Sequence, residues 1–120
     1  MLGKKKEEVQ ATALDRKIYK AFEVAHESRD ALESKVVDVI RKNGVVALYP
    51  EGADKAKAII DAEQAKHYMV NAIAQYDEAI RELNEMLALD HERETTIDWN
   101  NHFSTSHEIV ENVYFRYCMK

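Results

Sequence analysis

Residues that interrupt regular structure are scarce in this chain of 120 residues, which holds three Gly and one Pro. A β-rich domain needs many tight turns, and turns rely on Gly and Pro for backbone angles that other residues avoid. Apolar residues make up 46% of the chain and charged residues 32%. This composition excludes a turn-rich β fold and is typical of long amphipathic helices.

Cysteine is almost absent as well. The single cysteine, Cys118, has no partner for an intramolecular disulfide. The basic run Lys4-Lys5-Lys6 leads into acidic residues rather than into an apolar segment, so no secretory signal peptide is evident. No window approaches the roughly 18 apolar residues that span a bilayer. We therefore expect a cytoplasmic protein.

Motifs that carry chemistry are also missing. The chain has no Gly-rich phosphate loop and no serine nucleophile elbow. Cys118 and His107 fall on the same predicted helix, about 16 Å apart along its axis, which is too far for a Cys–His nucleophile pair. The sequence therefore predicts neither a catalytic site nor a cofactor.

A first long helix is predicted over residues 4–43, which contain neither Pro nor Gly. Apolar or small side chains recur there in alternating steps of three and four residues, with one arginine in the series. The series is Ile18, Phe22, Ala25, Arg29, Leu32, Val36 and Val39. This spacing is typical of the seam of a coiled coil. Asn43 and Gly44 are expected to end the helix, because Gly readily takes the left-handed conformation after a helix C-terminus.

A second helix is predicted over residues 54–90. Its predicted seam is Ile59, Ala62, Lys66, Met69, Ile73, Tyr76, Ile80, Leu83 and Leu87. The short connector, residues 44–53, makes the two helices antiparallel. Folding about this connector places Ala25 near Ile73 and Leu32 near Lys66. The many alanines of the second segment would let the helices approach closely.

The C-terminal segment has a different texture. Residues 91–104 lack a sustained period and are predicted to be irregular. Thr105 and Glu108 form a capping box, which predicts a helix over residues 105–118. Its apolar side would find the nearest apolar surface at the open end of the hairpin. The predicted fold is one all-α domain over residues 1–120, a long antiparallel, coiled-coil-like helical hairpin with a shorter C-terminal helix packed at its open end.

Charge is distributed unevenly around a formal net charge of −5. Residues 1–43 carry ten Lys or Arg against eight acidic residues, and residues 44–94 carry five against eleven. Opposite flanking charges favour pairing of the two long helices. An acidic chain lacks the electrostatic footprint of a nucleic-acid-binding domain, so direct nucleic-acid contact is not expected. A nucleic-acid accessory or regulatory role is a third hypothesis.

Histidine and glutamate supply the candidate metal ligands. Glu23 and His26 form a Glu-x-x-His motif, which in di-iron bundles brings both side chains to one metal pair. His102 and His107 would add nitrogen ligands in the C-terminal segment. The second Glu-x-x-His copy that such bundles use is absent from the sequence. A small metal- or ligand-binding bundle is therefore the alternative hypothesis, and solvated helix faces are the simpler interpretation.

The connector is unusually apolar and is the main candidate interaction site. Its residues Val45, Val46, Leu48, Tyr49 and Pro50 would either fold back as a buried loop or extra helical turn, or stay exposed as binding anchors. A two-helix arm also buries only one face of each helix. The sequence therefore favours a non-enzymatic helical module, such as an assembly component, adaptor or inhibitor. We expect it to bind a protein partner or to form a homo-oligomer, without contacting a membrane.

Overall fold

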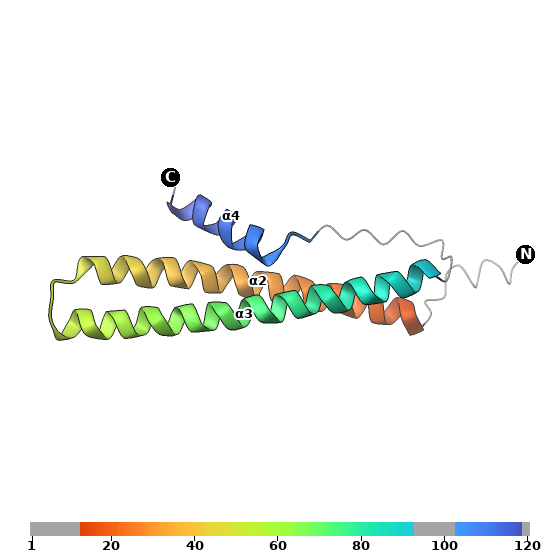
Figure 1. Cartoon of the computed structure of the whole chain (residues 1–120), viewed down its shortest axis with the longest axis horizontal. Helices are drawn as coiled ribbons and strands as arrows, with labels where there is room; N and C mark the ends of the chain where they lie inside the picture. Colours follow the sequence, from red (N-terminus) through yellow and green to blue (C-terminus); the bar gives the residue numbers. More distant parts are fainter. Residues whose placement is uncertain (1–12, 93–102, 119–120) are drawn as a thin grey trace, which may run out of the picture.

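A computed structural model describes residues 13–92 and 103–118 of the chain. Within these ranges it contains the helices α2 (Ala13–Leu48), α3 (Ala53–Glu92) and α4 (Ser106–Cys118). Figure 1 shows α2 and α3 side by side as a long antiparallel hairpin, with the short α4 beside α2. The 40 residues of α3 extend about 60 Å, whereas a compact domain of this size is roughly 35 Å across. The predicted all-α helical hairpin is confirmed.

The first long helix ends later than predicted. It continues through Asn43 and Gly44 to Leu48, so the turn spans only residues 49–52. The helix stops there because a proline ring disfavours helical backbone angles at the residue before it, here Tyr49. Gly52 takes a φ of 149° and its carbonyl accepts the Ala56 N–H at 3.1 Å. The predicted stop at Gly44 is wrong, since glycine inside a helix costs only about 1 kcal/mol and the following residues continue the hydrogen-bonded ladder.

Alanines form most of the buried side of α3. The buried apolar residues are Ala58, Ala62, Ala65, Ala72, Tyr76, Ala79 and Leu83. Ala62, Tyr76 and Leu83 match the predicted seam, but Ile59 and Lys66 are exposed, and Ala58 and Ala65 take their places. Small side chains allow the two helices to pack closely, whereas β-branched residues at these positions would hold the backbones apart. The helix is therefore rotated toward its alanines relative to the prediction.

The seam of α2 agrees with the prediction. Ile18, Ala25, Leu32, Val36 and Val39 are each at most 1% exposed. The register between the helices differs, however. Ala21 and Ala25 form a buried cluster with Ala79 and Leu83 rather than with Ile73, and Leu32 packs in a cluster with Ala72 and Tyr76 rather than beside Lys66. Because α2 ends later than predicted while α3 begins close to its predicted start, the centre of the turn lies further along the chain. The pairing partners of α2 therefore lie further toward the C-terminus of α3.

The last helix begins as predicted but packs at a different place. Thr105 Oγ1 accepts the Glu108 N–H at 3.2 Å, and the Glu108 carboxylate accepts the Thr105 N–H at 3.3 Å, which completes the capping box. Ile109 and Val113 are buried in the cluster that contains Leu32, Val36, Ala72 and Tyr76. This cluster lies near the middle of α2, so α4 covers the centre of the hairpin rather than its open end (Figure 1). The sequence identified the apolar face of α4 but not its position along the hairpin.

Candidate functional site

An aromatic cluster fixes where α4 starts. The Phe103 ring lies 4.8 Å from the His26 ring and 6.1 Å from the Phe22 ring, measured between centroids. The Arg29 guanidinium lies 5.8 Å from the same Phe103 centroid, within the range of a cation–π contact. Tyr76 lies on the α3 side, with ring centroids 6.5 Å apart. Residues from α2 and α3 therefore hold Phe103 at the entrance to α4.

Polar contacts reinforce this attachment. The Tyr76 hydroxyl donates a hydrogen bond to the Ser104 carbonyl, and burial raises the pKa of the Tyr76 phenol above its ordinary value. Near the other end of α4, Arg116 lies 3.9 Å from the Glu33 carboxylate of α2. The Arg29 Nε lies 3.8 Å from Glu33 Oε1, and the Arg29 side chain stays partly exposed. Apart from Tyr76 of α3, the residues that make these contacts with α4 and its entrance lie on the central part of α2, so α4 is positioned away from the turn.

The part of the hairpin around the turn is left uncovered by α4. We define the hairpin tip as residues 42–61, which include the last turns of α2, the turn and the first turns of α3. Leu48 is 83% exposed, Tyr49 42% and Val45 41%, while Pro50 is exposed and Val46 is half-buried. Residues 45–48 continue α2 as an extra helical turn, which is one of the alternatives that the sequence left open. That turn does not bury the apolar side chains of the candidate interaction site.

A groove runs along one side of the hairpin tip. It has a volume of about 300 Å³ and lies between α2 and α3. Val45 and Tyr49 provide its apolar wall, and Lys42, Asp54, Lys57 and Asp61 line it with two positive and two negative charges. Within residues 13–92 and 103–118, none of these four side chains has an ion-pair partner, whereas the neighbouring Lys55 lies 3.4 Å from Glu51. The groove therefore offers apolar contact together with four unpaired charges of balanced sign.

The candidate metal ligands lie in separate surroundings. Glu23 forms an ion pair with Lys20 at 3.6 Å, His26 contacts the Phe103 ring, and His107 lies 2.9 Å from Glu111. His102 lies outside the described residues. No group of three or more His, Cys, Asp or Glu side chains that could hold a metal ion occurs among the residues that the structure describes. The described ligands are therefore engaged locally and do not converge.

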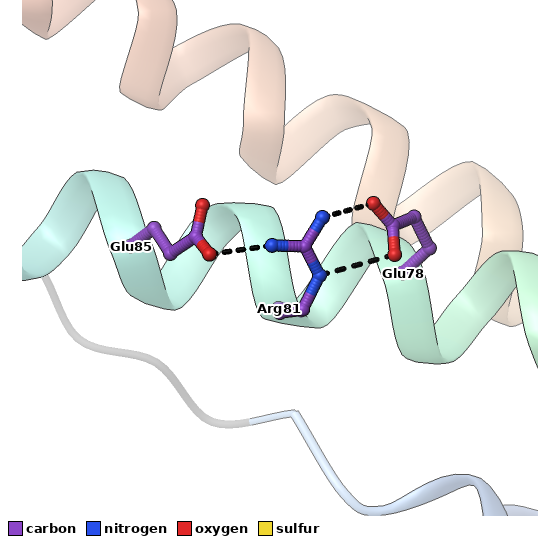
Figure 2. Close-up of polar contacts among 3 residues, drawn as sticks. All are labelled: Glu78, Arg81 and Glu85. Carbon is purple, nitrogen blue, oxygen red and sulfur yellow. Dashed lines mark hydrogen bonds and ion pairs between the residues drawn. The ribbon is translucent and has the colours of Figure 1, made fainter.

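A second, shallower groove lies between α2 and α3 beside the buried Ala79. Its volume is about 480 Å³, and it is lined by Val24, Ser28, Ala79 and Glu82, among others. Figure 2 shows the ion pairs beside it, where Arg81 of α3 contacts Glu78 on one side and Glu85 on the other. The hydrogen bond from Arg81 lowers the pKa of the Glu78 carboxyl, and these carboxylates raise the pKa of Arg81. These exposed charges satisfy one another within a single helix, as i,i+3 and i,i+4 pairs do.

Comparisons with protein-family models, with curated proteins and with solved structures find no match to this chain. No described helix is apolar enough over a sufficient length to cross a membrane.

The sequence singled out the apolar residues of the tip but missed the charged residues that line its groove. One sequence pattern could have identified three of these charged residues. Asp54, Lys57 and Asp61 alternate in sign at helical spacing, which places all three on one side of α3.

Proposed function

We propose that this chain is a non-enzymatic helical interaction module that docks on a protein through the hairpin tip. The supporting observation is the concentration of uncovered apolar side chains there. Of eleven large apolar side chains that are exposed among the described residues, five lie between positions 45 and 60. These five are Val45, Leu48, Tyr49, Ile59 and Ile60. Exposed apolar groups that gather in one region, with charged residues around them, are typical of protein-binding surfaces.

The arm behind the tip suits this function. Leu32 and Val36 are fully buried beneath α4, and Val39 continues the same buried seam toward the tip. The tip residue Leu48 lies sixteen residues beyond Leu32, which is about 24 Å along the helix axis. A packed two-helix arm loses little conformational freedom on binding, and this lowers the entropic cost of association.

Site-specific photo-cross-linking tests the proposal. A photoreactive residue replaces Leu48 in one variant, and the same residue replaces Leu89, which is 54% exposed near the other end of α3, in a matched control. Irradiation in the native cell should give discrete cross-linked species from position 48 and not from position 89. If neither position gives a discrete product, or if both give the same products, the tip is not the docking surface.

A further inference from the structure

The charge pattern of the tip groove indicates which kind of partner fits it. Lys42 and Lys57 face the same groove as Asp54 and Asp61, so the four charges sum to zero. A partner whose contacting surface carries one sign of charge would meet repulsion from half of these groups. A surface with both signs matches another surface with both signs.

In a dimer with a two-fold axis, both copies use the same surface patch for binding. That patch must therefore be complementary to itself in shape and charge. Along α3 the groove presents Asp54, Lys57 and Asp61 in the order negative, positive, negative. When this stripe is turned antiparallel to a second copy, Lys57 of each chain can lie opposite an aspartate of the other. In this arrangement Val45 and Tyr49, which line the groove of each chain, would contact apolar side chains of the second copy.

We propose that the partner of the tip groove is a second copy of this chain, bound antiparallel about a two-fold axis with each Lys57 facing an aspartate of the other copy. This inference rests on the proposed function and specifies its partner. The tip supplies only five large apolar side chains that are exposed, whereas stable complexes bury about 800 Å² per partner. The dimer is therefore expected to dissociate on dilution.

Paired charge reversals test this dimer with the full chain. One variant carries Lys42→Asp with Lys57→Asp, so its groove is entirely acidic. The other carries Asp54→Asn with Asp61→Lys, so its groove is entirely basic, and asparagine keeps a polar residue in the first turn of α3. Sedimentation velocity measures the mass of each protein over a range of concentrations, and circular dichroism verifies that each variant keeps its helix content. Each variant alone should dimerise about tenfold or more weakly than the unmodified chain, and an equimolar mixture should recover the dimer.

A matched control separates the groove from net charge. Lys17→Asp with Lys66→Asp changes the net charge as much as the acidic variant does, and both lysines are exposed outside the groove. This control should dimerise as the unmodified chain does. A strictly monomeric unmodified chain would overturn the inference while leaving docking on another protein open to the cross-linking test. Reversed variants that still dimerise alone, or a mixture that does not recover the dimer, would also overturn it.

Discussion

The buried alanines of α3 and the hydrophobic periodicity of the sequence predict opposite orders for the destabilising effects of two substitutions, Ala79→Leu and Ile59→Ala. Ala79 is 4% exposed and lies in a buried cluster with Ala21, Ala25 and Leu83. Ala79→Leu would push a branched side chain between two closely packed helices, and overpacking of this kind costs about 1–3 kcal/mol. Ile59 is 44% exposed, so Ile59→Ala removes a contact that is only partly buried and should cost about 1 kcal/mol.

Thermal unfolding followed by circular dichroism, at concentrations where the chain is monomeric, compares the two variants. For a domain of this size, 1 kcal/mol corresponds to a fall of roughly 3–6 °C in Tm. Ala79→Leu should therefore lower Tm more than Ile59→Ala does. If the seam predicted from the sequence, which includes Ile59 but not Ala79, were the buried one, Ile59→Ala would cost about 2–5 kcal/mol and Ala79→Leu less than about 0.5 kcal/mol. That reversed order would refute the packing described for α3.

Gly44→Ala should stabilise the chain by about 0.5–1 kcal/mol, because Gly44 is helical and an added Cβ meets no atom within 4 Å. Gly52→Ala should destabilise the chain, because the φ of Gly52 is positive. A loss of stability in urea titrations of Gly44→Ala would contradict the helix end at Leu48. Phe103→Ala should increase hydrogen exchange in α4 with little change in α2 and α3, and Phe115→Ala, at an exposed position, should not; equal exchange in both variants would contradict the role given to Phe103. Because the folded chain raises the pKa of Tyr76, folding favours the protonated phenol, so the stability that this shift contributes is present below about pH 10 and is lost as pH rises through the folded pKa. Urea titrations at alkaline pH should therefore show a steeper loss of stability in the unmodified chain than in Tyr76→Phe, and identical slopes would count against the buried hydroxyl.

Local signals were sufficient for much of the fold. The scarcity of Gly and Pro and the 3-4 spacing of apolar residues predicted two long helices, and five of the seven predicted seam residues of α2 are buried. The pair Thr105 and Glu108 predicted the start of α4, because a capping box depends only on side chains three residues apart. The apolar connector was also visible in the sequence, since Leu48 and Tyr49 lie in it.

Other features depend on which surfaces meet in three dimensions. Ala79 and Ile80 are adjacent in sequence, and both are apolar residues that can lie on the buried side of a helix. Which of them faces α2 depends on how closely the two backbones approach. The same applies to α4, whose apolar face fits more than one place along the hairpin until Phe103 packs between residues of α2 and α3.

The sequence by itself therefore determined the helix content, the antiparallel hairpin and the apolar nature of the connector, because each depends on residues that are close together along the chain. The tertiary structure decided the rotation of α3, the register of the hairpin and the position of α4, because each depends on packing between residues distant in sequence. It also brought Lys42 of α2 beside Asp54, Lys57 and Asp61 of α3 in one groove. Charges on two different helices become one binding surface only when the packing of those helices places them together.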